Sequence, residues 1–118
     1  MLAPNKLFGL LGDQTRLRCL ALLMDVEELC VCEFIEILQL TQTKISRHLS
    51  LLRLAGIVVD ERRGLWIYYR LNPNLPLWAK DVLKTTASII HNQEPFFSDK
   101  SKLSKEDRCD SKFWLFSL

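Results

Sequence analysis

The sequence predicts a mainly α-helical (α+β) domain with about five helices and one two-stranded β-hairpin. Apolar residues recur at helical spacing along most of the chain up to residue 91. Two runs rich in β-branched and aromatic residues, 57–62 and 65–71, flank a break that contains Gly64, which indicates the hairpin. Of the 118 residues, 48% are hydrophobic, so the chain can bury the core of a single domain.

Three helices are expected in the first third of the chain. Residues 4–11 form a short apolar helix, and Asp13 caps a second helix at residues 14–24. A third helix is expected at residues 31–38. The three carry apolar side chains at the spacing of a buried face: Leu7, Phe8, Leu10 and Leu11, then Leu17, Leu20, Ala21 and Met24, then Phe34, Ile35 and Leu38.

The fourth expected helix lies within residues 41–55. Thr41 is a natural N-cap, because its hydroxyl can accept a hydrogen bond from the exposed N–H groups of the first turn, and Gly56 ends the helix. Its buried stripe consists of Ile45, Leu49 and Leu52. A helix, a turn of a few residues and a helix with a polar face make the arrangement called helix-turn-helix.

The polar side of this fourth helix carries hydroxyls, an amide and cations but no acid: Gln42, Thr43, Lys44, Ser46, Arg47 and Ser50. Arg and Lys can bind guanine edges or phosphates, and short Thr and Ser side chains let a helix approach a major groove closely. The alternative is an ordinary solvated helix, which usually mixes charges of both signs. The missing acids favour a helix that reads double-stranded DNA.

The predicted hairpin follows this helix and carries Arg62 and Arg63 at its tip. Cations on a hairpin behind a DNA-reading helix can contact the phosphate backbone or the adjacent minor groove. Such a hairpin is a wing, and the fold is then a winged helix-turn-helix. The alternative is a plain hairpin with a solvated basic tip.

A last helix, expected at residues 75–91, is too apolar for one solvated side. Together with the first helix it could form a homodimer contact, since helix-turn-helix proteins commonly read two half-sites as two-fold dimers. We therefore place a DNA-binding and dimerisation domain at residues 1–94. Residues 95–118 are expected to form a mobile C-terminal tail. Its apolar end at 113–116 could dock on the domain or the partner subunit, or could associate with other surfaces nonspecifically.

The distribution of charge limits the partners. Residues 39–70 hold six bases and two acids, whereas residues 13–38 hold six acids and two bases, as expected if one face approaches phosphate. No apolar run approaches the roughly 18 residues of a membrane span, and the N-terminus lacks a signal-peptide pattern. A cytoplasmic protein with no membrane partner is therefore expected, and its four cysteines should be reduced.

Cys30 and Cys32, at the start of the third helix, are candidate ligands for a soft, thiophilic ion. Residues i and i+2 of a regular helix project about 200° apart, so two such sulfurs meet one ion only if the helix unwinds or begins later. Ion binding would then strain the helix that supports the DNA reader. The alternative is a pair of small buried hydrophobes. Cys19 and Cys109 are the candidates for a third sulfur.

Three segments closely resemble the arsenic-responsive repressors of the ArsR/SmtB family. They are Glu28-Leu29-Cys30-Val31-Cys32-Glu33, then Thr41-Gln42-Thr43-Lys44-Ile45-Ser46-Arg47-His48-Leu49, then Trp66-Ile67-Tyr68-Tyr69-Arg70-Leu71. The resemblance implies a homodimeric winged helix-turn-helix repressor, which leaves its palindromic operator DNA when arsenite or antimonite binds cysteine thiolates. In that family a third cysteine often follows three residues after the second, where this chain has Ile35.

The expected function is thus an arsenite- or antimonite-responsive repressor, with As(III) or Sb(III) as effector and no cofactor. A sensor of cadmium, lead or zinc ions, or a thiol-redox-responsive repressor of the same fold, is the alternative. An enzyme is not expected, since thiol oxidoreductases prefer a Cys-x-x-Cys motif on a βαβ scaffold.

Overall fold

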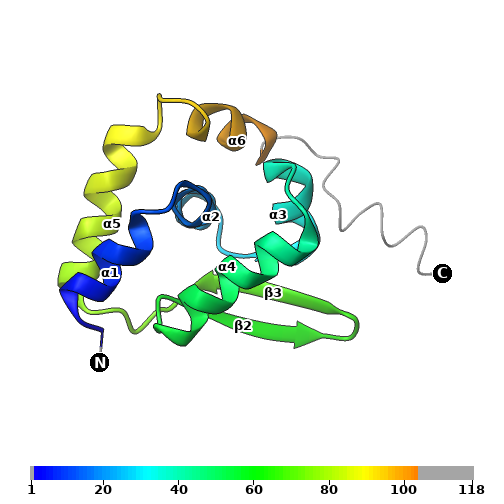
Figure 1. Ribbon diagram of the computed structural model, residues 1–118, viewed down its shortest axis with the longest axis horizontal. Helices are drawn as coiled ribbons and strands as arrows, with labels where there is room; N and C mark the ends of the chain where they lie inside the picture. Colours follow the sequence, from blue (N-terminus) through cyan, green and yellow to red (C-terminus); the bar gives the residue numbers. More distant parts are fainter. Residues whose placement is uncertain (1, 104–118) are drawn as a thin grey trace.

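The computed structural model describes residues 2–103, which form six helices and a three-stranded antiparallel sheet (Figure 1). The helices are α1 (Pro4–Leu11), α2 (Gln14–Asp25), α3 (Val31–Leu38), α4 (Gln42–Leu54), α5 (Leu77–Ile90) and α6 (Phe96–Leu103). The strands are β1 (Leu29–Cys30), β2 (Val58–Arg63) and β3 (Trp66–Leu71). Figure 1 shows α2 end-on near the centre, with the other helices around it and the β2–β3 hairpin along one side.

Helix α2 is the centre of the core, because its side chains find partners on several sides. It contacts α1, α4, α5, α6 and β3. Its Leu20 and Leu22 are almost completely buried, and removing such apolar surface from water is what drives the helices together. Side chains from other elements complete the core: Leu7, Leu29, Phe34, Ile45, Leu49, Leu52 and Ile57.

The sheet has the strand order β1–β3–β2. In the hairpin, Arg63 pairs with Trp66 across a two-residue turn. The first turn residue, Gly64, has φ +62°, a conformation that glycine adopts without steric cost. On the other side of β3, β1 pairs Cys30 with Tyr68. The chain just before α3 is therefore joined to the wing by backbone hydrogen bonds.

The turn from α3 to α4 confirms the predicted helix-turn-helix. Gln39 ends α3 in the left-handed conformation, with φ +57°. Two residues later, the Thr41 hydroxyl accepts a hydrogen bond from the backbone N–H of Lys44 at 3.2 Å, as the sequence predicts for an N-cap. The two helices pack against each other.

The predicted helices and hairpin are confirmed to within two residues at each end, but two elements are additional. One is the short strand β1. The other is α6, which corrects the expectation of a mobile tail for residues 96–103. Phe96 and Asp99 of this helix are buried against the domain. Residues 104–118, with Cys109 and the apolar end at 113–116, lie outside the described residues.

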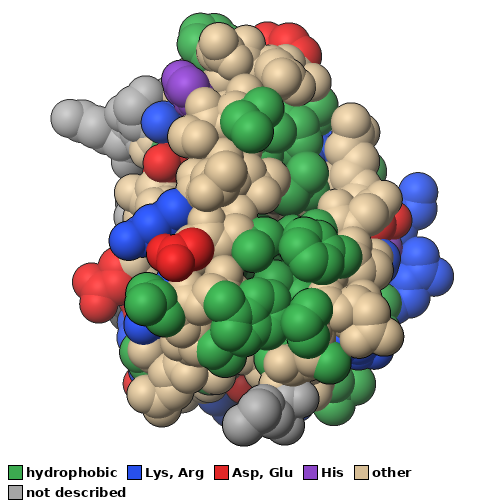
Figure 2. Space-filling view, turned by 90° about the vertical axis from the view of Figure 1, so that its left-hand side faces the viewer, with side chains coloured by type: hydrophobic (Ala, Val, Ile, Leu, Met, Phe, Trp, Pro, Cys, Tyr) green, Lys and Arg blue, Asp and Glu red, His purple; other side chains and the backbone are tan. Residues whose placement is uncertain are grey.

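One face of the domain, formed by α1 and α5, is apolar (Figure 2). Phe8 on α1 is 56% exposed, and Leu77 and Ile89 on α5 are 73% and 59% exposed. Apolar side chains gathered in this way mark a surface suited to another protein. Within residues 2–103, none of the helices has the length and hydropathy needed to cross a membrane.

Candidate DNA-binding face and cysteine site

Helix α4 has one buried and one open face. Its stripe of Ile45, Leu49 and Leu52 is completely buried. The six candidate DNA-binding residues of this helix retain solvent contact: Gln42, Thr43, Lys44 and Arg47 are exposed, and Ser46 and Ser50 are half-buried. The open face is therefore free of acids, and its cations can reach a phosphate or a base edge.

His48, on the same helix, faces inward rather than toward this open face. It is 8% exposed, and Nη1 of Arg16 lies 3.2 Å from its Nδ1. Arg16 in turn donates a hydrogen bond from Nε to the carbonyl of Leu10 at 2.8 Å. Burial lowers the pKa of His48, and a neutral Nδ1 can accept the hydrogen bond that arginine donates. His48 thus anchors α4 to α1 and α2.

The two wing arginines have different surroundings. Arg63 donates hydrogen bonds to both carboxylate oxygens of Glu28, at 2.6 and 2.7 Å, and to Glu61 at 2.9 Å. Its guanidinium also lies over the ring of Tyr68, 4.4 Å from the centroid. The hydrogen bond from Arg63 lowers the pKa of Glu28. Within residues 2–103, Arg62 makes no such ion pair, so it is the wing cation more available to DNA.

The cysteine pair lies where β1 passes into α3. Cys30 is the N-cap of α3 and has an extended backbone, with φ −82° and ψ 160°, whereas Cys32 belongs to the first turn. The side chains of Cys30 and Glu33 form a reciprocal capping box, in which the Cys30 N–H donates to Glu33 Oε1 at 3.0 Å. The two sulfurs are joined in a disulfide, and the Cα atoms lie 5.4 Å apart. This differs from the expectation that these cysteines are reduced.

This local geometry resolves the difficulty expected from helical spacing. The helix does begin later, at Val31, and the extended Cys30 turns its sulfur toward that of Cys32. In this conformation the two sulfurs lie close together at the start of α3. That ion binding strains α3 stays a prediction. Glu33 was missed as a part of this site, although a Cys-x-x-Glu spacing at a helix start resembles the capping-box pattern.

Cys19, the candidate for a third sulfur that lies within residues 2–103, does not join the pair. Cys19 is completely buried on α2, and burial raises the pKa of its thiol to about 12. A thiol with so high a pKa stays protonated and is a poor ligand. Among residues 2–103 there is no cluster of three or more metal-binding side chains. Cys109 lies beyond the described residues.

A pocket of ≈ 250 Å³ lies between Cys32 and the open face of α4. Its lining comes from the start of α3, from α4 and from the wing: Val31, Cys32 and Ile35, then Gln42 and Ser46, then Leu65, Trp66 and Ile67. A group bound to Cys32 would therefore lie beside two candidate DNA contacts, Gln42 and Ser46. Trp66 and Ile67 in the wall from the wing belong to β3, and Cys30 is paired with Tyr68 of the same strand.

Comparison with known proteins agrees with this arrangement. The family model for bacterial regulatory proteins of the arsR family matches residues 13–59. The arsenic resistance transcriptional regulator ArsR1 of Pseudomonas putida is 45% identical over 105 residues, which cover 89% of this chain and 80% of that protein. The arsenical resistance operon repressor of Escherichia coli K12 is 46% identical over 82 residues, or 70% of each protein.

A solved structure is similar as well. The transcriptional repressor BigR of Xylella fastidiosa has a TM-score of 0.64 at 28% identity, over 75% of this chain and 83% of that chain. The likeness thus extends well beyond the helix-turn-helix and confirms the resemblance seen in the sequence. This chain belongs to the arsR family of bacterial regulatory proteins.

Proposed function

We propose that this chain is a homodimeric transcriptional repressor that leaves its operator when trivalent arsenic or antimony binds Cys30 and Cys32. The observation that carries the proposal is the pocket shared by Cys32 of α3 with Gln42 and Ser46 of α4. The two similar proteins, one an arsenic resistance regulator and one an arsenical resistance operon repressor, support the same effector.

The DNA side of the proposal rests on the open face of α4. Thr43, Lys44, Ser46 and Arg47 would meet the major groove, with Gln42 and Ser50 at the margins. Arg62 would contact the backbone from the wing. Arg63 would mainly hold the wing against Glu28, since its guanidinium already donates hydrogen bonds to the carboxylates of Glu28 and Glu61.

The effector side rests on thiolate chemistry. Once reduced, two cysteines suit a thiophilic, trivalent metalloid, which forms two bonds to sulfur while two of its hydroxides leave as water. The N-terminal end of α3 favours the thiolate form through its positive dipole end. Cys30 and Cys32 would hold the ligand, and Ile35 would face it as an apolar wall of the same pocket.

Release from DNA would follow from where the ligand lies. A group held on Cys32 occupies space beside Gln42 and Ser46, so the first turn of α4 must shift relative to the wing. Cys30 is paired through β1 to Tyr68 on β3, so a change at this cysteine also reaches the wing directly. Ligand binding that favours the shifted position of α4 weakens DNA binding. The coupling free energy is the same as that by which bound DNA weakens ligand binding.

The dimer would use the apolar face of α1 and α5. Phe8, Leu77 and Ile89 are each more than half exposed on these two helices. Apolar side chains gather on the face shown in Figure 2. A second copy of the chain would cover them around a two-fold axis, which places two α4 helices to read two half-sites.

A thiol-redox-responsive repressor is the second candidate, and the Cys30–Cys32 disulfide favours it. In that case an oxidant such as peroxide would take two electrons and two protons from the thiols, giving the disulfide and two waters. Oxidation of Cys32, rather than ligand binding, would then change the pocket that Cys32 shares with Gln42 and Ser46.

The test is fluorescence anisotropy on a labelled DNA fragment from upstream of the chain's own gene, with protein that is reduced by a phosphine and then separated from it by desalting. Arsenite, antimonite, cadmium, lead, zinc and hydrogen peroxide are titrated separately. Arsenite is expected to release the wild type but not Cys30→Ser or Cys32→Ser, while Cys19→Ala, a control that removes a thiol elsewhere, still responds. DNA binding that only peroxide reverses would replace the arsenite proposal with the redox one.

A further inference from the structure

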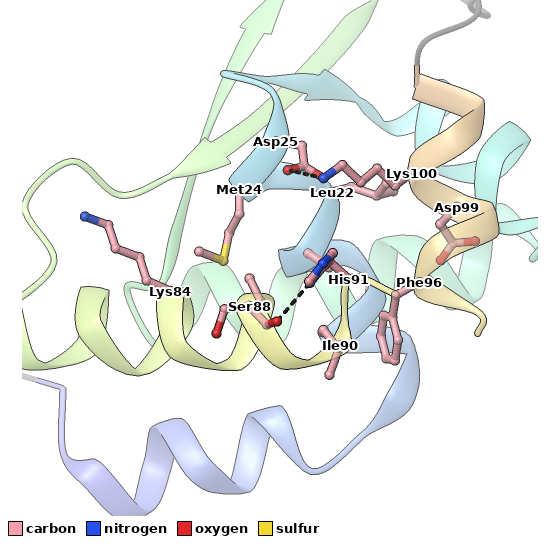
Figure 3. A pocket seen from close by; sticks show the side chains of 12 residues that line it. Leu22, Met24, Asp25, Lys84, Ser88, Ile90, His91, Phe96, Asp99 and Lys100 are labelled. Carbon is pink, nitrogen blue, oxygen red and sulfur yellow. Dashed lines mark hydrogen bonds and ion pairs between the residues drawn. The ribbon is translucent and has the colours of Figure 1, made fainter. Parts of the chain in front are cut away.

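Helix α6 is fixed to the domain by a buried ion pair. Arg18 of α2 donates two hydrogen bonds to the carboxylate of Asp99, from Nε and from Nη2, both at 2.8 Å. The two side chains are only 16% and 3% exposed. Figure 3 shows Asp99, Phe96 and Lys100 on α6 beside residues of α2 and the end of α5. The helix is therefore a packed element of the fold.

The far end of α6 reaches helix α3. The ammonium of Lys102 donates a hydrogen bond to the backbone carbonyl of Ile37 at 3.0 Å. Ile37 lies in the last turn of α3, where carbonyls have no partner within the helix. A cation at this position also meets the negative end of the helix dipole. Lys102 thus supplies a C-terminal cap from a different helix.

These contacts hold α3 at the end opposite its cysteines. Cys30 and Cys32 lie at the N-terminal end of α3, and Lys102 binds its C-terminal turn. The chain then passes through Gln39 and enters α4 at Thr41. Since α2 carries Arg18 and α3 carries the carbonyl, α6 spans the two helices that support α4.

We propose that α6 is a clamp that holds α3 in the position from which α4 reads DNA, with Lys102 as its positioning residue. The clamp lies outside residues 13–59, the span that the family model matches. The proposal rests on the proposed function in one respect, namely that effector binding shifts the first turn of α4 away from its DNA-reading position, which α3 supports. A clamp that favours the DNA-reading position must then oppose the effector.

A clamp differs from a contact that only stabilises the fold, because loss of a clamp changes operator affinity and effector affinity in opposite directions. Loss of the Lys102 hydrogen bond should weaken operator binding and, by reciprocity, strengthen effector binding to the free protein. A contact that only stabilises the fold would shift the unfolding midpoint and leave both affinities alone, or weaken both together. The two affinities are therefore the decisive measurements.

The experiment compares Lys102→Met with Lys100→Met as a matched control. Both changes remove one positive charge from α6, but Lys100 pairs with Asp25 of α2 at 3.5 Å in an exposed ion pair (Figure 3). Lys102→Arg keeps a cation that can reach the carbonyl and serves as the rescue. Operator affinity is read by anisotropy, arsenite affinity of free protein by calorimetry, and stability by urea unfolding.

For Lys102→Met we expect operator binding weakened about threefold to tenfold and arsenite binding tightened by a similar factor. Lys100→Met should stay within about twofold of wild type in both, and Lys102→Arg should return toward wild type. Equal operator affinities for the two methionine variants would overturn the clamp while leaving the proposed function standing. So would arsenite binding that weakens together with operator binding in Lys102→Met.

If the wild type binds its upstream DNA but not arsenite, the proposed effector fails. The positioning role of Lys102 then stands if Lys102→Met alone loses operator affinity while urea unfolding shows it to be as fully folded as Lys100→Met and Lys102→Arg, and it fails if the loss of affinity only follows a loss of stability.

Discussion

Arg18 of α2 and Asp99 of α6 face each other in a two-bond fork, although 81 residues separate them in the chain. Both hydrogen bonds measure 2.8 Å, and the carboxylate is almost completely buried. The hydrogen bond to Asp99 raises the pKa of Arg18 further above its ordinary value. Each of these two desolvated charges is stabilised by the other. Either one alone would be a buried charge without a partner, which is strongly unfavourable.

Asp99→Asn should therefore be costly for stability. The amide keeps the size of the carboxylate but leaves the Arg18 guanidinium without its counter-charge, so we expect a loss of about 2–4 kcal/mol in the free energy of unfolding. Urea denaturation followed by circular dichroism measures the loss. The control is Asp60→Asn, since Asp60 lies 3.8 Å from Arg53 in a pair that is about two-fifths exposed. Similar small losses in both variants would show that the fork adds little.

The same fork explains why α6 could not be foreseen. Residues 96–103 contain three Ser or Asp and two Lys among eight residues, and their apolar pattern is weak. Helices are predicted from local periodicity, but α6 is held by Arg18 and by the Ile37 carbonyl, which are distant in sequence. A polar composition that is typical of a tail becomes a helix once those two partners are in place.

The cysteine site was predictable in position but not in conformation. The sequence places Cys30 and Cys32 at the start of α3, as the structure confirms for the helix itself. It gives no sign that Cys30 pairs with Tyr68 in a two-residue strand, because so short a strand has no periodicity. That pairing keeps Cys30 extended and lets the two sulfurs meet. The difference in surroundings between Arg62 and Arg63 was also not predictable. It depends on Glu28, which lies 35 residues from Arg63 in the sequence and binds only Arg63 of the two.

His48 should make the protein less stable as the solution becomes mildly acidic. Burial lowers its pKa in the folded state below the ordinary value of 6.5, so the unfolded chain takes up the proton first. The stability contribution is present above the ordinary pKa and is lost as the pH falls below it. The free energy of unfolding is expected to decrease between about pH 7.5 and about pH 5.5, before most carboxylates titrate.

The control for this pH dependence exploits the second histidine. His48→Gln can still accept the hydrogen bond from Arg16 but cannot titrate, so the decrease should become smaller. His91→Gln removes an exposed histidine, whose Nδ1 lies 2.8 Å from the carbonyl oxygen of Ser88, and should leave the decrease unchanged. The assignment to His48 is wrong if both variants keep the full decrease.

The two wing arginines should differ in what they contribute to DNA binding. Arg62→Ala is expected to weaken binding and to reduce the slope of log affinity against log salt by about one, because one phosphate contact is lost. Arg63→Ala should reduce this slope less, since its guanidinium is already held by Glu28 and Glu61. Anisotropy titrations at several salt concentrations give both slopes. A larger change of slope for Arg63→Ala would mean that DNA displaces the carboxylates.

The apolar face of α1 and α5 should decide the oligomeric state. Ile89 is 59% exposed near the C-terminal end of α5, so a charged residue there costs an isolated domain little. In a dimer that covers this face, Ile89→Asp would bury a charge without a partner in each subunit, which is strongly unfavourable. We therefore expect sedimentation equilibrium to show a dimer for the wild type and mostly monomer for Ile89→Asp.

The matched control is Leu65→Asp, at the tip of the hairpin, where the leucine is 83% exposed and away from this face. It should leave the dimer intact, although it lines the pocket beside Cys32 and would add an acid to the wing. Ile89→Asp should also weaken operator binding steeply, because a monomer reads only one half-site. A variant that remains dimeric and keeps its operator affinity would place the subunit contact on another surface of the domain.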